Sequence, residues 1–241
     1  MDPSAREGQR ASLRRLAVLG VACAALMFGA PVGADVPRAD AVPLHLVQSW
    51  PLTERDFDQD GAVTPTHRLR LEMVMMSGSG WTAERILEMT KRAAKILAQC
   101  GIRTTFAELH EFDGPERYRY LDTPVSRELA RRAHLARPAV FFVADTRNRP
   151  GFDAEAIGRA NSRWRPEMTN TVWITAQSRD PANVMAHELA HVLANSGEHS
   201  ELPGNLMREE TAPQSVTLSA EQCRRITENG AAGGLLQPVK P

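Results

Sequence analysis

Three of the chain's seven histidines fall within the thirteen residues HELAHVLANSGEH, positions 187 to 199. On a helix, His187 and His191 lie about 40° apart around the axis and about 6 Å apart along it, so both imidazoles can meet one metal ion. Glu188 lies about 100° round from His187, where its carboxylate can take a proton from water bound to that metal. The pattern is typical of a zinc site that hydrolyses amides, most naturally peptide bonds.

His199 is the candidate third ligand, and its position requires the chain to turn back. If the helix continued unbroken, His199 would lie about 18 Å beyond His187 and about 120° round the axis. Residues 195–197 (NSG) accept a left-handed backbone, so we expect the helix to end there and the chain to return His199 to the metal. Downstream glutamates are the alternative third ligands, as in some other zinc peptidases: Glu201, Glu209 and Glu210.

This stretch resembles the active site of the metzincin clan of zinc endopeptidases, whose pattern is HExxHxxGxxH followed by a methionine in a tight turn. The match is residue by residue at His187, Glu188 and His191. It then departs, because Ala194 stands at the glycine position and His199 comes two residues late. The eight-residue step from His199 to Met207 is the one found in the matrixin branch.

The resemblance implies a zincin-like fold of the α/β (α+β) class. It consists of a mixed twisted sheet with a long helix behind it, an active-site helix that carries HExxH, and a small irregular C-terminal subdomain that ends in a helix. The resemblance also implies one catalytic zinc ion, with Met207 forming a hydrophobic floor under the metal. An edge strand would pair with extended substrate, and the candidate residues are Ala156, Ile157, Gly158, Arg159 and Ala160.

Hydrophobic periodicity predicts the elements that position this motif. Alternating apolar residues indicate a strand at 67–76, and Thr82 is placed to cap a helix that Gly101 ends. Asp180 and Pro181 mark the start of the HExxH helix. Ser219 and Gln222 form a capping-box pattern before the last helix, which Gly230 is expected to end. Further strands are expected near 102–109, 138–145, 156–163 and 170–176, and a short helix is expected at 126–136.

The N-terminal residues 1–34 read as a signal peptide, because four arginines precede an apolar run of about fifteen residues, too short for a membrane span. We therefore expect an exported protein, periplasmic or secreted, without a stable membrane span after cleavage. An uncleaved anchor and lipid attachment at Cys23 are the alternatives. Residues 35–66 are expected to form an irregular arm or short pro-segment, 67–230 a metzincin-like catalytic domain, and 231–241 a loose tail.

Composition limits the partners and cofactors. Basic and acidic residues number 29 each, so no strongly basic field indicates nucleic acid, and 42% hydrophobic residues suffice for a sizeable core. Cys100 and Cys223 are expected to form a disulfide, with two buried free thiols as the alternative. The segment 56–61 (DFDQDG) opens like a calcium loop, but His67 stands where a bidentate Glu is needed, so we expect a turn and no calcium.

These observations predict an exported zinc-dependent endopeptidase that acts on a protein or peptide, with Glu188 as general base. One alternative is a non-catalytic envelope protein in which Glu198 or Glu201 fills the fourth coordination position of a stabilising metal. Another is a zinc hydrolase of a non-peptide amide, because the chemistry at the metal is the same. The sequence leaves the substrate preference and the oligomeric state open.

Overall fold

The computed structural model describes residues 43–59, 63–147, 156–159, 165–210 and 212–239, with the backbone alone for 156–159. The predicted signal peptide, Cys23 and Ala160 lie outside these residues. All the described residues belong to one compact unit, Ala39–Pro241. Among them, no helix is both long and apolar enough to cross a lipid bilayer.

Strand β2 (His67–Met76) shows how the sheet divides the core into two layers. Leu69, Leu71 and Met73 turn to one face and join the larger hydrophobic cluster. Val74 and Met76 turn to the other face and join a second cluster. Successive side chains of a strand point to opposite faces, so a strand apolar on both sides must be covered on both sides.

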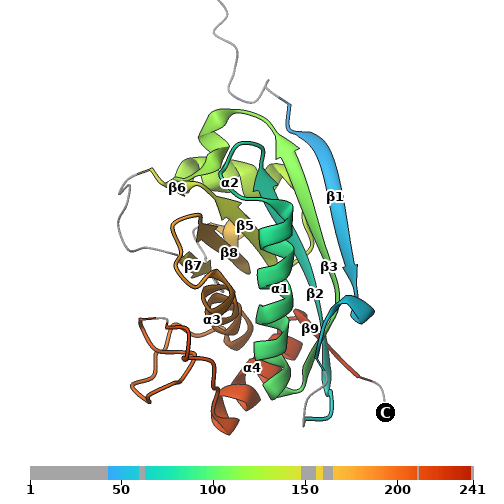
Figure 1. Cartoon of the computed structure of the whole chain (residues 1–241), viewed down its shortest axis with the longest axis vertical. Helices are drawn as coiled ribbons and strands as arrows, with labels where there is room; N and C mark the ends of the chain where they lie inside the picture. The colour runs from blue at the N-terminus through green and yellow to red at the C-terminus, as the bar shows by residue number, and fades with distance from the viewer. Residues whose placement is uncertain (1–42, 60–62, 148–155, 160–164, 211, 240–241) are drawn as a thin grey trace, which may run out of the picture. The chain divides into compact units, whose positions relative to one another are not determined.

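Seven strands of the described chain form one mixed sheet (Figure 1). Its order is β1 (His45–Thr53), β3 (Ile102–Asp113), β2, β5 (Ala139–Val143), β8 (Thr171–Thr175) and β7 (Ala156–Arg159), with β9 (Leu236–Pro238) paired to the start of β2. Strands β3, β2, β5 and β8 are parallel, whereas β1, β7 and β9 are antiparallel to their neighbours. The predicted mixed α/β class is confirmed. Two short strands, β4 (Tyr120–Leu121) and β6 (Asp145–Thr146), form a separate parallel pair.

Helices cover both faces of the sheet. Helices α1 (Ala83–Leu97), α3 (Pro181–Ala194) and α4 (Ala220–Ala232) contribute to the larger cluster, and α2 (Thr123–Arg132) contributes to the second. The Thr82 hydroxyl accepts a hydrogen bond from the Arg85 amide and caps α1, as predicted. The described residues also include four short 3₁₀ turns, at Glu54–Asp56, Ala98–Cys100, Glu116–Arg119 and Pro166–Met168.

The prediction of an irregular arm was wrong for the segment that forms β1. This strand pairs along its length with β3, and Leu52 and Trp50 pack into or against the larger cluster. The sequence did not indicate this strand because of Pro51. Proline has no N–H to donate to a strand ladder, so its presence argues against a central strand. In the described sheet β1 lies at an edge, where proline is tolerated.

The C-terminal prediction was wrong in a similar way. Helix α4 continues through Gly230 to Ala232, and residues expected to be loose form β9 against β2. A Cβ atom at Gly230 would lie 2.8 Å from Leu236 Cδ1, and Leu236 is buried. Gly230 therefore allows β9 to approach α4 closely and does not end the helix.

The predicted disulfide is present between Cys100 and Cys223, with their Cα atoms 4.8 Å apart. It joins the turn after α1 to α4 across a sequence separation of 123 residues. The bond therefore ties the middle of the chain to the C-terminal segment that follows the HExxH motif.

Candidate metal centre

Helix α3 holds the HExxH motif in the interior of the protein. Residues Ala182–His187 are all buried, as are Leu189, Ala190, Val192 and Leu193. Pro181 occupies the first turn, where its missing N–H costs nothing. Asp180 takes the N-cap position as predicted, but its side chain makes no capping hydrogen bond. The orientation of the helix is thus set mainly by packing, which fixes the directions of its two histidines.

His187 and His191 point their Nε2 atoms at each other, 2.9 Å apart. His187 Nδ1 lies 2.7 Å from the Leu206 carbonyl oxygen, and His191 Nδ1 lies 2.8 Å from the Ser196 carbonyl oxygen. A carbonyl can only accept, so each Nδ1 carries the proton and donates it. Both Nε2 atoms are then left with a free lone pair, as in metal-ligating histidines whose other nitrogen is hydrogen-bonded.

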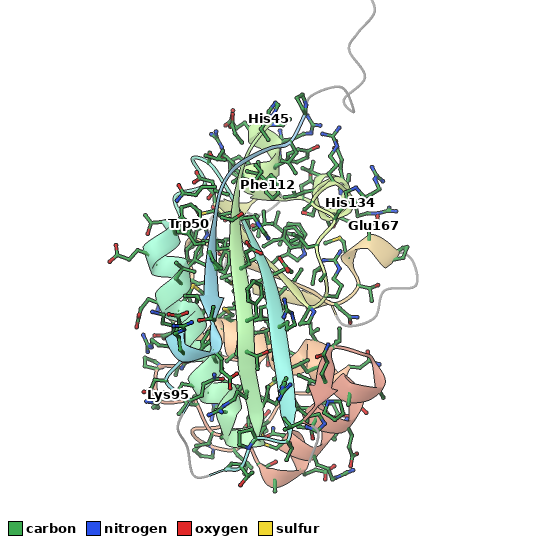
Figure 2. All side chains as sticks on the ribbon, turned by 90° about the vertical axis from the view of Figure 1, so that its right-hand side faces the viewer. His45, Trp50, Lys95, Phe112, His134 and Glu167 are labelled. Atoms are coloured by element: carbon green, nitrogen blue, oxygen red, sulfur yellow. A yellow bond between two sulfur atoms is a disulfide. The ribbon has the colours of Figure 1, made fainter. Side chains whose placement is uncertain are left out.

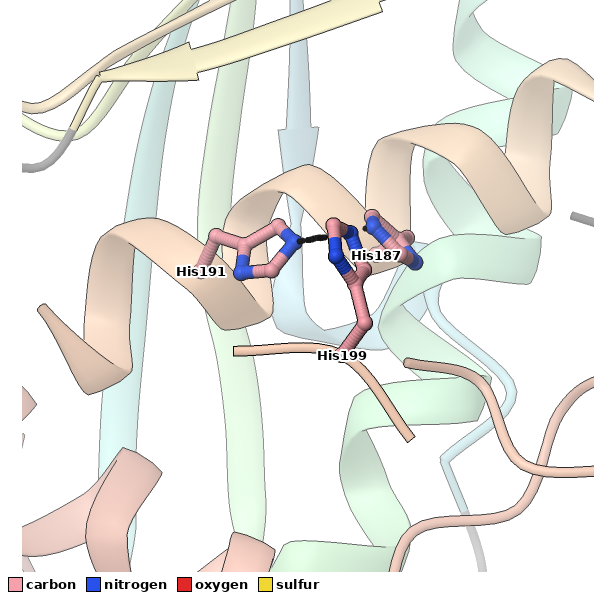
Figure 3. A group of neighbouring side chains, drawn as sticks. All are labelled: His187, His191 and His199. Atoms are coloured by element: carbon pink, nitrogen blue, oxygen red, sulfur yellow. Dashed lines mark hydrogen bonds between the residues drawn. The ribbon is translucent and has the colours of Figure 1, made fainter. Parts of the chain in front are cut away.

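The chain turns back at Asn195, as the NSG sequence predicted. Asn195 adopts the left-handed conformation (φ 48°, ψ 44°), and the Ser196 amide donates to the His191 carbonyl at 3.2 Å. The returning segment brings His199 Nε2 to 3.3 Å from His191 Nε2 (Figure 3). The two additional residues therefore do not keep His199 away from the other histidines. Its role as third ligand stays a prediction.

The Nε2 separations at His191 are comparable with those around a tetrahedral metal. Zinc–nitrogen bonds of about 2.0–2.1 Å at tetrahedral angles separate the nitrogens by about 3.3 Å. The two Nε2 separations are 2.9 and 3.3 Å, and the three ligand atoms all lie within 4.8 Å of one another. Two nitrogens with free lone pairs repel each other at such distances, and a cation between them would remove that repulsion.

Burial also keeps the helix histidines unprotonated. Desolvation lowers the pKa of His191 to about 4, and the pKa of His187 is lowered in the same direction for the same reason. Both imidazoles are therefore neutral at pH 7. The neutral form is the one that binds a metal ion.

The segment from Asn205 to Met207 is held by buried and part-buried hydrogen bonds. Met207 is 5% exposed, and its amide donates to Asn205 Oδ1 at 2.9 Å. Asn205 also exchanges two side-chain hydrogen bonds with Gln222, at 2.9 and 3.1 Å. These bonds position Leu206, whose carbonyl accepts from His187. Sequence reasoning missed Asn205 and Leu206, although Gln222 was already visible as part of the capping box.

The alternative glutamates are placed differently. Glu201, Glu209 and Glu210 are not among the residues whose ligand atoms gather with the three histidines. Glu198 forms an ion pair with Arg225 on α4, at 2.5 Å, and this pairing holds the pKa of the Glu198 carboxyl below its usual range. Glu188 is half-buried on α3, next to His187 in sequence.

The surroundings of the cluster include a cavity and a sheet edge. A cavity of about 260 Å³ opens between the end of α3, the returning segment and α4, and its lining includes His191, His199 and Met207. Among the residues that the structure describes, β7 is the last strand in the order of the main sheet, and it pairs with β8 in antiparallel register. Ala156, Ile157, Gly158 and Arg159 form this strand, which lies against α3, and its pairing with substrate stays a prediction.

Comparisons with known proteins identify no family. Neither known protein families nor curated proteins match the chain. Among solved structures it is similar to metalloproteinase-II from Bacteroides fragilis, with 18% sequence identity and a TM-score of 0.48. The alignment covers 70% of this chain and 55% of that one, so the chain spans just over half of that protein's length.

Proposed function

We propose that this chain is a zinc-dependent endopeptidase, with His187, His191 and His199 as ligands and Glu188 as general base. The convergence of three imidazole Nε2 atoms carries the proposal. Two of the rings are oriented by hydrogen bonds to backbone carbonyls, which leaves their Nε2 lone pairs free, and the ligand atoms of all three residues lie within 4.8 Å of one another. Three neutral nitrogen donors are a usual ligand set for catalytic zinc.

Glu188 is the residue that moves the proton in this mechanism. A bound zinc ion supplies Lewis acidity, which makes water more acidic and polarises the carbonyl under attack. The Glu188 carboxylate accepts the proton that the attacking water loses and then delivers it to the leaving amine. Its half-buried position on α3, next to a ligand, suits both steps. Met207 forms the apolar floor beside the ligands.

A peptide substrate is favoured by the sheet edge. Strand β7 ends the described order of the sheet, and an extended peptide can add to such an edge through main-chain hydrogen bonds. The contact between β7 and α3 would place that peptide close to the histidines. We therefore assign Ala156–Arg159 as the substrate strand.

Export is the location that fits the proposal. The signal-like segment 1–34 predicts passage to the periplasm or the medium. The Cys100–Cys223 disulfide is compatible with an oxidising compartment, where such bonds form and persist.

The test combines zinc content with peptide cleavage in Glu188→Gln, which keeps the shape of the side chain. We expect equal zinc content in both proteins, with at least one tightly held ion per chain, and a cleavage rate lower by about 10²–10⁴-fold in the variant. Glu84→Gln, an exposed change on α1, is the matched control and should cleave normally. Cleavage at the parent rate by Glu188→Gln would show that the mechanism is wrong.

The same preparation separates the two rival functions. A purely structural zinc site has a full set of protein ligands, whereas the Glu198–Arg225 ion pair engages one carboxylate that could have completed it. Zinc-loaded protein that cleaves no member of a random peptide library would favour a structural role. Chelator-sensitive turnover of small amides without peptide cleavage would favour a non-peptide amidase.

A further inference from the structure

A second group of metal-ligating side chains lies on the opposite face of the sheet from α3. Glu72 of β2 stands directly beside Glu108 of β3 in the parallel register, and His110 follows two residues further along β3. Their chain neighbours Leu71, Met73, Ala107 and Leu109 all join the core on the α1 and α3 side. Alternation therefore directs the three polar side chains to the other face. Strands β1, β3 and β2 lie side by side at the front of Figure 2.

The three side chains converge as the histidine cluster does. His110 Nε2 lies 2.8 Å from one carboxylate oxygen of Glu72 and 4.0 Å from one of Glu108. One ligand atom from each residue falls within 4.8 Å of the other two. On the far side of the ring, the Ser49 hydroxyl of β1 lies 2.8 Å from His110 Nδ1. When Nδ1–H donates to Ser49, the Nε2 lone pair faces the two carboxylates.

Two carboxylates lie side by side at this position. Like charges on directly paired strand residues are destabilising, and Glu72 and Glu108 occupy such a pair. Their side chains are 21% and 29% exposed, so water screens them only in part. Among the described residues, His110 pairs with both carboxylates, which requires a proton on Nε2; a metal ion bound between the three groups would replace that proton. A divalent ion would neutralise both carboxylates at once.

We propose that Glu72, Glu108 and His110 bind a divalent transition-metal ion such as zinc. Imidazole suits zinc and its neighbours, and carboxylates also coordinate it, whereas calcium needs six to eight oxygen ligands. Partial exposure leaves room for water at the remaining coordination positions. The ion would join β2 to β3 directly, and β1 through Ser49. This site stabilises the sheet and is independent of hydrolysis at the histidine cluster.

Zinc stoichiometry of the full chain tests the site by equilibrium dialysis and elemental analysis. We expect about two zinc ions per chain at saturation, falling to about one when Glu72→Gln and Glu108→Gln are combined. His191→Ala should also reduce the count by about one, from the other site. Glu111→Gln is the matched control, because Glu111 neighbours His110 on β3 but bonds to Ser77. Saturation of the parent chain at one zinc, with no further loss in the double variant, would overturn the proposal.

Thermal unfolding provides a second measurement in the His191→Ala background, where the histidine cluster no longer contributes. Zinc should raise the unfolding midpoint of that chain, because a ligand that binds only the folded state stabilises it. The increase should disappear when Glu72→Gln and Glu108→Gln are added. An equal increase in the presence and absence of the two glutamates would place the zinc elsewhere. Circular dichroism without zinc checks that the glutamine variants fold, and we expect them to fold because the carboxylate repulsion is gone.

Discussion

The two halves of the histidine cluster are built on different principles. His187 and His191 come from a buried helix, and the surrounding core fixes both rings. His199 is exposed and comes from an irregular segment that returns after Asn195. One half follows from local helix geometry, whereas the other depends on contacts with distant parts of the chain.

Besides its bonds to the two helix histidines, the returning segment is held by an internal bond and by contacts with the C-terminal helix. The Ser200 amide donates to the Met207 carbonyl at 2.7 Å, and Asn205 pairs with Gln222 of α4. Glu198 pairs with Arg225 of the same helix. The disulfide then fixes α4 to the end of α1. The position of His199 therefore depends in part on the docking of α4.

The largest expected effect compares one ligand from each half. His187→Ala should weaken zinc binding by more than about 100-fold. Loss of a hydrogen bond that only supports a ligand costs less affinity than loss of the ligand itself. His199→Ala should weaken zinc binding less, because water can reach an exposed coordination position and replace the imidazole. Competition with a chromogenic chelator measures both affinities. If His199→Ala costs as much as His187→Ala, the two halves are equivalent and the comparison fails.

The second largest effect is expected from removal of the disulfide, which should loosen the segment that carries His199. The paired change Cys100→Ser and Cys223→Ser should lower the free energy of unfolding by about 2–5 kcal/mol. Urea denaturation of oxidised parent and variant measures the loss, and reduced parent is the control. The variant should also release zinc faster, since α4 is less firmly attached. An unchanged unfolding midpoint would show that α4 docks without the bond.

Acid should destabilise the metal-free protein through His191, which belongs to the helix half of the histidine cluster. Burial holds the pKa of His191 at about 4, against about 6.5 in the unfolded chain, so below about pH 6.5 only the unfolded chain takes up this proton. Stability therefore falls as the pH drops from about 6.5 to about 4, by about 3 kcal/mol for this group.

Urea unfolding with chelator present, at about pH 7.5 and about pH 4.5, measures this acid loss. His191→Asn should lose less stability between the two pH values, because the titrating ring is gone. His199→Asn, on the exposed half, is the control. An identical loss in parent and His191→Asn would contradict burial as the cause.

The smallest effect is expected at Asn205, which supports the floor of the site without touching a metal. Asn205→Ala removes the partner of the Met207 amide and of Gln222, and should cost about 1–3 kcal/mol of stability. Zinc affinity should fall by about tenfold, because Leu206 no longer orients His187 firmly. Asn229→Ala, at an exposed asparagine of α4 that bonds to the Ala194 carbonyl, is the matched control. Equal zinc affinity in Asn205→Ala and Asn229→Ala would show that Asn205 does not support the site.

Local signals predicted much of this structure. The alternation in β2, the HExxH spacing in α3, the left-handed turn at Asn195 and the Ser219 capping box each involve residues within a few positions of one another. Such patterns depend on backbone geometry that the neighbouring side chains determine. These patterns predicted where the two helix histidines lie and that the chain turns back after α3.

The missed features depend on partners far away in sequence. Strand β1 is ordered by pairing with β3 in spite of Pro51, and Gly230 is explained by the later Leu236. The Asn205–Gln222 bonds and the Glu72–Glu108 pairing exist only once strand register and helix docking are fixed. A hydrophobic or capping pattern contains no information on such contacts.

The disulfide also closes a covalent ring. The ring runs from Cys100 to Cys223 and encloses α3, the returning segment and all three histidines. A single nick in any peptide bond inside it would leave the two pieces joined through sulfur. In the function proposed above, the disulfide would keep the three histidines of the cluster on one connected molecule after a first cut by another protease or by a second copy of the chain. Only reduction would then release the fragments.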